Sequence, residues 1–385
     1  MPILNKRANK TPLGLYVHVP FCRSKCQYCD FYSMATKDDK LMDGYLDAVC
    51  DHIKEAGELA PGYKVDSVYF GGGTPSFFGA DGLAVILTTI RRNFDVVPDA
   101  EISVECNPDS VSDRLLHRLY AEGFNRVSLG VQSDDDEILK KLGRPHTYAQ
   151  AATAYQRIRK AGFRNVSIDL MYGLPGQDLQ DWQETLDNVL RLNPEHVSCY
   201  ALKIEEGTPF YDYKEMLNLP DDETQADMYL AAVEALRSRG FRQYEISNFA
   251  RNGKYSRHNT SYWQQNPYIG FGPSAHSYDL HSRQWNTANL KTYINHLNEG
   301  TLSFEKEELK PVDLYNEYVM TSLRTMWGME KQKLEGDYTV FWEQVQEQVR
   351  KYERSGDLVE EGGRWKICET GWVISDAILS DLFVV

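Results

Sequence analysis

Three of the chain's seven cysteines lie within eight residues near its start. Cys22, Cys26 and Cys29 are separated by three residues and then by two. The run before them, Gly14 to Phe21, alternates apolar residues as a buried strand does, so the cysteines follow the end of a strand. Thiolates are soft ligands, and three of them on one short loop can converge on one metal centre.

Four interpretations of this loop compete. A closed zinc site or an ordinary iron–sulfur cluster needs four ligands, and the neighbourhood offers no fourth cysteine. A disulfide would use two cysteines and leave one over. Three chemically idle core cysteines this close together would be a strong coincidence. The remaining interpretation is a cubane cluster with three protein ligands and one open iron, which is a position for binding a ligand.

The spacing of Cys22, Cys26 and Cys29, with the aromatic Tyr28 just before the third cysteine, resembles the motif of the radical S-adenosylmethionine (SAM) superfamily. The resemblance implies a [4Fe–4S] cluster held by these three cysteines, with SAM chelated by the open iron. In that family one electron from the cluster cleaves SAM to a 5′-deoxyadenosyl radical.

Size and composition restrict the class of protein. At 385 residues the chain has room for one large domain and a smaller one. Its formal net charge of −14 argues against a nucleic-acid surface, because phosphate binding depends on Lys and Arg. No run approaches the ~18 apolar residues that cross a membrane. Met1 to Thr11 lacks the apolar core of a secretory signal, so we expect a cytoplasmic protein with free cysteines.

From residue 14 to about 240, short apolar runs alternate with longer segments of helical period. Six strands are expected, at Leu15–Pro20, Ser67–Phe70, Ile102–Glu105, Arg126–Val131, Val166–Met171 and Val197–Leu202. Six helices are expected between and after them, at 39–58, 80–93, 112–122, 147–161, 178–192 and 221–239. These units predict an α/β fold with a parallel sheet, either doubly wound or a barrel. The family resemblance implies a partial (β/α)6 radical SAM barrel.

Ligands of such sheets bind beyond the carboxyl ends of the strands, and the unusual residues of this chain gather at that edge. The expected strand ends carry Cys22, the run Gly71-Gly72-Gly73-Thr74-Pro75, Glu105 with Asn107, Gln132, Asp169 with Gly173, and Ala201 with Glu205. Each of these residues alone is a weak indication. Their shared position predicts one site at one barrel mouth.

Several of these residues have ordinary explanations as well. The glycine triplet could be only a tight turn, yet a backbone without side chains directly after a strand lets a ligand approach closely. Glu105 could be a solvated charge, or a partner for cationic or hydroxyl groups of a ligand. Asp169 lies in an otherwise apolar strand, where an unpaired charge is costly, which favours a functional role. Arg144 could simply cap the preceding helix.

Further segments resemble the branch of the superfamily that contains the oxygen-independent coproporphyrinogen III oxidases and their relatives. They are Leu15 to Cys22, Phe70 to Pro75, Ser128 to Ser133 and Ile168 to Pro175. In the family the glycine loop holds the amino-acid end of SAM; its usual form ends in Glu, whereas here it is Gly-Gly-Gly-Thr. Carried over motif by motif, the resemblance implies SAM contacts from Tyr16, Tyr28, Gly72, Gly73, Thr74, Glu105, Gln132, Arg144, Asp169 and Ala201.

Beyond residue 240 the pattern changes. Tyr244–Phe249 is expected as another strand, followed by a long functional loop of Gly, Asn and aromatic residues from Arg257 to Tyr278. Helices are expected at 288–299, 311–327 and 337–355, then a hairpin and a last helix. They resemble the small, mostly helical, winged-helix-like C-terminal domain of this branch. The predicted domains are a barrel at 1–240, a connecting strand and aromatic loop at 241–300, and the C-terminal domain at 301–385.

Within the branch, the sequence favours a haem chaperone over an oxidase. The oxidases carry an additional cysteine just beyond the motif and a long N-terminal extension, whereas this chain has Asp30-Phe31 there and only about fifteen residues upstream. The stretch His258-Asn259-x-x-Tyr262-Trp263 instead resembles the HemW-type haem chaperones, which bind haem and pass it to haem proteins. Imidazole can ligate haem iron and aromatic rings can stack on a macrocycle, so the resemblance makes His258 the leading candidate for the axial ligand.

We therefore expect a radical SAM haem chaperone with a [4Fe–4S] cluster, SAM and haem. The expected partners are haem and acceptor haem proteins, respiratory and membrane-associated ones among them, without nucleic acid. The alternative is an oxygen-independent coproporphyrinogen III oxidase; that activity is not expected, although the radical SAM core could still cleave SAM. For His258 the ordinary alternative is a hydrogen-bonded loop histidine, and His18, His276 and the unused cysteines are rival haem ligands.

Overall fold

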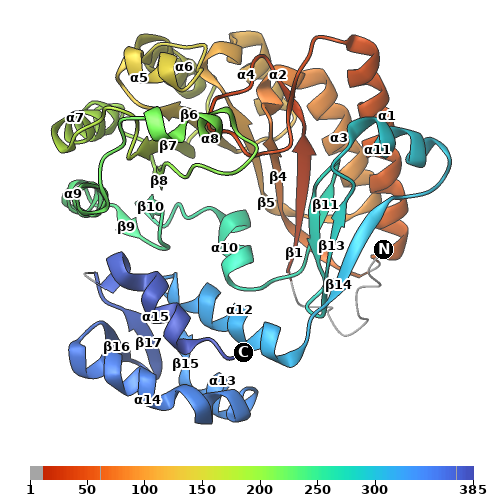
Figure 1. Ribbon diagram of the computed structural model, residues 1–385. Helices are drawn as coiled ribbons and strands as arrows, with labels where there is room; N and C mark the ends of the chain where they lie inside the picture. Colours follow the sequence, from red (N-terminus) through yellow and green to blue (C-terminus); the bar gives the residue numbers. More distant parts are fainter. Residues whose placement is uncertain (1–11, 61, 370) are drawn as a thin grey trace.

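The computed structural model describes residues 12–60, 62–369 and 371–385. Figure 1 shows a large α/β part and, below it in this view, a smaller part formed by the C-terminal elements. The expectation that Met1 to Thr11 carries no targeting signal falls outside the described residues.

Six parallel strands form the centre of the large part. They are β1 (Pro12–Val19), β4 (Lys64–Gly72), β5 (Asp95–Cys106), β6 (Arg126–Gln132), β7 (Val166–Tyr172) and β8 (His196–Ala201). Each pairs in parallel with the next. All six overlap the strands expected from the sequence, so the predicted parallel sheet is confirmed.

A long helix follows each of these strands. The helices are α1 (Asp39–Leu59), α3 (Ala80–Asn93), α4 (Asp113–Ala121), α6 (Tyr148–Lys160), α7 (Leu179–Leu190) and α9 (Asp222–Ser238), all within two residues of the expected ends. Local sequence sets their starts: Asp38 caps α1, and Thr147 with Gln150 forms a capping box on α6. Shorter elements in the connections are β2 (Phe21–Cys22), β3 (Met34–Ala35), α2 (Pro75–Phe78), α5 (Asp136–Lys141) and α8 (Pro209–Asp212).

Side chains of the central strands alternate between the covering helices and the barrel interior. In β1, Leu13, Leu15 and Val17 belong to the large hydrophobic core and are fully buried. Tyr16 and His18, at the alternate positions, line a cavity instead. The sheet therefore separates an apolar core outside the barrel from a polar interior, where ligand chemistry can occur.

The sheet continues beyond the six strands on both sides, in the order β14-β13-β12-β11-β1-β4-β5-β6-β7-β8-β10-β9. The added strands are β9 (Arg242–Gln243), β10 (Asn248–Ala250), β11 (Tyr268–Phe271), β12 (His276–Tyr278), β13 (Ser282–Asn286) and β14 (Phe304–Glu308). Helices α10 (Arg257–Trp263) and α11 (Leu290–Asn298) connect them. Within the described ranges the two ends of this sheet do not pair, so the barrel is partial, as the resemblance implied.

Two expectations for the segment after residue 240 are wrong. The strand expected at Tyr244–Phe249 is interrupted, because β9 ends at Gln243 and β10 begins at Asn248. The long loop expected from Arg257 to Tyr278 contains α10, β11 and β12 instead. These elements are short, and β11 pairs with β1 from the other end of the chain, so local periodicity does not reveal them.

The smaller part consists of helices around a three-stranded sheet. Its elements are α12 (Pro311–Leu323), β15 (Met329–Glu330), α13 (Lys331–Gly336), α14 (Thr339–Ser355), β16 (Leu358–Glu361), β17 (Arg364–Ile367) and α15 (Ser375–Leu382). The expected helices and hairpin are present, although α12 ends at Leu323 rather than at residue 327. The domain boundaries at residues 240 and 300 stay predictions. No helix in the described ranges combines the length and apolar character needed to cross a bilayer.

Leu129→Ala should lower the free energy of unfolding by about 2–5 kcal/mol, because it leaves a cavity at a core position of β6. Chemical denaturation followed by circular dichroism measures the change. Val85→Ala on α3, where the side chain is 48% exposed, is the control and should cost less than about 0.5 kcal/mol. Equal losses in both variants would contradict the burial of Leu129.

Candidate functional site

The three clustered cysteines lie at the barrel mouth. Cys22 ends β2 and, like Cys26, is buried, whereas Cys29 is half-buried. Two polar side chains from other elements reach their sulfurs. The Thr74 hydroxyl donates to Cys22 Sγ at 3.5 Å, and Arg144 Nη1 donates to Cys26 Sγ at 3.5 Å. A guanidinium beside a buried sulfur stabilises the thiolate form that a metal needs.

Asn107 links these two partners of the cysteines. Its amide nitrogen donates to Thr74 Oγ1 at 3.2 Å, and its amide oxygen accepts from Arg144 Nη2 at 2.9 Å. Arg144 also donates to the carbonyl of Gly130 at 2.8 Å. Sequence reasoning noted Asn107 at a strand end but assigned it no role, because its importance lies in contacts between distant segments. The Arg144 side chain reaches the cysteine loop, so it does more than cap a helix.

The donor set suits an iron–sulfur cluster. Among the described residues, no three His, Cys, Asp or Glu side chains are arranged to hold a single metal ion. In a cubane each thiolate binds a separate iron, so its ligands need not meet at one point. All seven cysteines lie in the described ranges and form no disulfide. The other four lie on α1, β5 and β8 and after β17, outside this loop.

The glycine triplet at the end of β4 leaves no room for side chains. Gly72 has φ +108°, and a Cβ on it would lie 2.6 Å from the ring of His18. A Cβ on Gly73 would lie 2.8 Å from the carbonyl oxygen of Phe21. Bare backbone is therefore required beside the cysteine loop, as expected for a segment that a ligand approaches closely.

Two half-buried carboxylates, on β5 and β7, accept hydrogen bonds from uncharged donors. Glu105 accepts hydrogen bonds from the Tyr69 hydroxyl at 2.7 Å and from the amide of Gly72 at 3.2 Å. Burial raises the pKa of Glu105 to about 7. Asp169 accepts from the Ser128 hydroxyl at 2.8 Å, and burial raises its pKa as well. Carboxylates bonded mainly to hydroxyl and amide donors favour a ligand with cationic or hydroxyl groups.

The remaining predicted contacts surround the same mouth. Gln132 has φ +70° at a β-bulge, a strained backbone of the kind found at functional sites. The Tyr16 ring stacks near Tyr69, with centroids 6.2 Å apart. Tyr28 packs against a group of buried apolar side chains that includes Met171 and Phe210. Ala201 is exposed and ends β8. These residues lie near the carboxyl ends of the strands or in the cysteine loop, and the His258 ring, deeper in the barrel, stacks near Tyr16 with centroids 6.4 Å apart.

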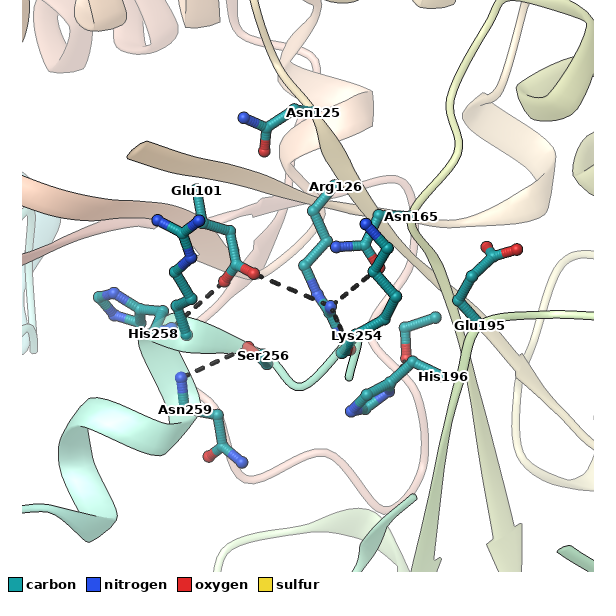
Figure 2. Close-up of polar contacts among 12 residues, drawn as sticks. Glu101, Asn125, Arg126, Asn165, Glu195, His196, Lys254, Ser256, His258 and Asn259 are labelled. Atoms are coloured by element: carbon teal, nitrogen blue, oxygen red, sulfur yellow. Dashed lines mark hydrogen bonds and ion pairs between the residues drawn. The ribbon is translucent and has the colours of Figure 1, made fainter. Parts of the chain in front are cut away.

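His258 lies at the start of α10, toward the amino ends of the strands, and is 2% exposed. Its Nδ1 shares a hydrogen bond with Ser67 Oγ at 3.0 Å, and its Nε2 shares one with the Tyr262 hydroxyl at 2.7 Å. Figure 2 shows its backbone amide donating to Glu101, whose carboxylate also faces Arg126. Because each ring nitrogen has a partner, a role as haem ligand would require the ring to leave both.

A second feature is an aromatic cavity of about 560 Å³, a size typical of small-molecule sites. It lies between the segment after the cysteine loop, β1, α10, strands β11 to β13, and α12. Its aromatic lining includes Phe31, Tyr32, Tyr262, Trp263, Tyr268 and Tyr278. Tyr16 and His18 line it too, so the cavity and the glycine loop share the wall made by β1. Large flat rings offer a surface for a planar ligand.

The comparisons with known proteins agree with this geometry. Residues 16–189 match the family model of the radical SAM superfamily. The chain is 35% identical over 327 residues to "Heme chaperone HemW" of Bacillus subtilis, with 84% of this chain and 86% of that protein covered. It is 35% identical over 376 residues to the protein of the same name from Mycobacterium tuberculosis, with 96% and 95% covered.

One solved structure resembles nearly the whole chain. Coproporphyrinogen III oxidase (HemN) from Escherichia coli, described as a radical SAM enzyme, superposes with a TM-score of 0.85 at 25% sequence identity. The likeness covers 98% of this chain and 91% of that chain. It therefore extends through the C-terminal part as well as the barrel.

Replacing Cys22, Cys26 or Cys29 by Ala should abolish the visible absorbance of a reconstituted cluster, because these three thiolates are the expected protein ligands. Anaerobic reconstitution followed by iron and sulfide analysis measures the loss. The matched controls are Ala replacements of Cys50, Cys106, Cys199 and Cys368, which should keep the cluster. Loss of the cluster in any control would show that the ligand set is wrong.

Proposed function

This chain belongs to the HemW family of the radical SAM superfamily, and we propose that it binds haem and transfers it to acceptor haem proteins. The observation that carries the proposal is the aromatic cavity directly beside the three-cysteine loop. Relatives covering most of this chain are named haem chaperones, and the aromatic rings that line this cavity offer stacking surface for a macrocycle.

The radical SAM family implies a [4Fe–4S] cluster and SAM, and we propose that the barrel mouth holds both. Cys22, Cys26 and Cys29 are the proposed cluster ligands, which leaves one iron for SAM. The bare backbone of Gly72 and Gly73 would accept the amino-acid end of SAM. When bound, the two cofactors supply one-electron reductive chemistry.

Side chains around the proposed cofactor site position the cysteines and supply negative charge. Arg144 and Thr74 hold two of the cysteine sulfurs, and Asn107 holds both of these side chains in turn. Glu105 and Asp169 provide the negative charge that a sulfonium and an ammonium group need. The proposed SAM contacts also include Tyr16, Tyr28, Gln132 and Ala201, whose positions at the mouth are compatible with that role.

The second candidate function is oxygen-independent coproporphyrinogen III oxidation, which the likeness to the Escherichia coli oxidase favours. Against this function stand the two residues that follow the cysteine motif, because neither is a cysteine. Asp30 follows Cys29 directly; Phe31 comes next, is 66% exposed, and lines the aromatic cavity. An aromatic ring there adds stacking surface for a macrocycle and supplies no thiol.

The proposed setting is the cytoplasm, because seven cysteines without a disulfide suit a reducing compartment. The proposed partners are haem and acceptor haem proteins, including respiratory ones at a membrane. A net charge of −14 disfavours nucleic acid as a partner.

SAM affinity should fall as the pH drops below about 7, because protonation of Glu105 removes a charge that faces the cationic ligand. The expected loss is up to about tenfold per pH unit. Equilibrium dialysis on either side of that pH measures the affinity. Glu105→Gln, a neutral side chain of the same shape, should bind SAM weakly and with little pH dependence. A variant that keeps the full pH dependence would contradict the role of Glu105.

The proposed function is tested by two assays on one anaerobic, reconstituted sample. The haem-loaded protein should lose its haem spectrum as a haem-free acceptor protein gains one. With coproporphyrinogen, SAM and a reductant, it should form no protoporphyrinogen, while the Escherichia coli oxidase does so under the same conditions. Formation of protoporphyrinogen at a comparable rate would favour the second candidate function instead.

A further inference from the structure

We propose that His276 is the side chain that ligates haem iron in the aromatic cavity, an assignment that rests on the proposed function. His276 lies on β12, is exposed, and lines the cavity. What distinguishes His276 from the other candidate histidines is that its ring nitrogens are not engaged by other described residues.

Three histidines lie in or against the cavity, and two have both ring nitrogens engaged. The Nε2 of His18 contacts the carbonyl of Tyr32 at 2.8 Å, and its Nδ1 contacts the Tyr16 hydroxyl at 3.1 Å. His258 is held by Ser67 and Tyr262 in the same way. Within the described residues the ring of His276 has a stacking partner only, so either of its nitrogens can face a metal.

Neighbouring residues hold the His276 ring without occupying its nitrogens. The ring stacks on Trp285, its cross-strand neighbour on β13, with centroids 5.8 Å apart and an interplanar angle of 26°. Tyr278, two residues further along the strand, lines the same cavity. Iron ligation needs a lone pair on a neutral imidazole. Burial and the nearby Arg283 guanidinium both lower the pKa of His276, which keeps the ring neutral near pH 7.

The same cavity offers groups for the two carboxylates of haem. Arg283 contributes the one Lys or Arg side chain of the described lining, and it already pairs with Glu317 at 2.8 Å. The indole N–H of Trp263 is buried and has no hydrogen-bond partner within the described residues. An unpartnered buried donor at a cavity wall favours a ligand that carries an acceptor.

These contacts give His258 a different role from iron ligation. Its ring bonds to the Tyr262 hydroxyl, and Tyr262 in turn packs edge-on against Tyr268 with centroids 4.6 Å apart. Tyr262 and Tyr268 both line the cavity. His258 is therefore a positioning residue that fixes the aromatic wall, while His276 meets the iron.

Anaerobic haem titration of the reconstituted full chain, followed by absorbance and electron paramagnetic resonance, tests the assignment. His276→Ala should lose the spectrum of imidazole-ligated iron and bind haem about tenfold more weakly or worse. Added imidazole should restore that spectrum. His258→Gln should weaken binding but keep the imidazole spectrum, because it disturbs only Tyr262. His281→Ala, an exposed histidine at the turn before β13, is the matched control and should change neither.

An unchanged spectrum in His276→Ala, or loss of the imidazole spectrum in His258→Gln alone, would overturn the ligand assignment and leave the proposed function standing. If the unaltered chain binds no haem, the proposed function itself fails and the assignment falls with it.

Discussion

The buried guanidinium of Arg126 needs hydrogen-bond acceptors inside the barrel, and it finds them on neighbouring strands and on the segment that leads into α10. Its side chain is 2% exposed and donates to Asn165 at 3.0 Å and to the carbonyl of Lys254 at 3.1 Å. It also faces Glu101, whose carboxylate receives the amide of His258 (Figure 2). Leaving such a charge unpaired would cost about 3–5 kcal/mol. The contacts of Arg126 with the Lys254 carbonyl and with Glu101 therefore position the segment that leads from Lys254 into α10.

From the start of α10, a series of contacts continues through the His258 ring to the barrel mouth. The His258 ring stacks near Tyr69, with centroids 5.3 Å apart, and the Tyr69 hydroxyl bonds Glu105 beside the glycine loop. Further along α10, Tyr262, which bonds to the His258 ring, and Trp263 line the aromatic cavity. One buried helix start thus supports both candidate sites. Their closeness gives a physical basis for the proposed combination of radical SAM chemistry and haem binding in one barrel.

The sequence predicted the parts of this account that depend on local pattern. Alternating strands and helical periods located the six βα units, and the cysteine spacing located the mouth. The role of Asn107 could not be predicted, because it depends on hydrogen bonds to Thr74 and Arg144, and sequence periodicity does not reveal contacts between distant segments. The motif identified His258 as a candidate. Its ring partner Ser67 lies 191 residues away in the sequence, so the burial of the ring could not be predicted from local pattern. Helix α10 was not predicted, because seven residues are too few to show a helical period in the sequence.

The most direct test is the structure of the haem-loaded protein with iron positions located by anomalous scattering. We expect two separate iron sites: a cluster against Cys22, Cys26 and Cys29, and a single iron in the aromatic cavity next to His276. Haem iron found outside that cavity, on the surface or at a cysteine of another segment, would contradict this expectation.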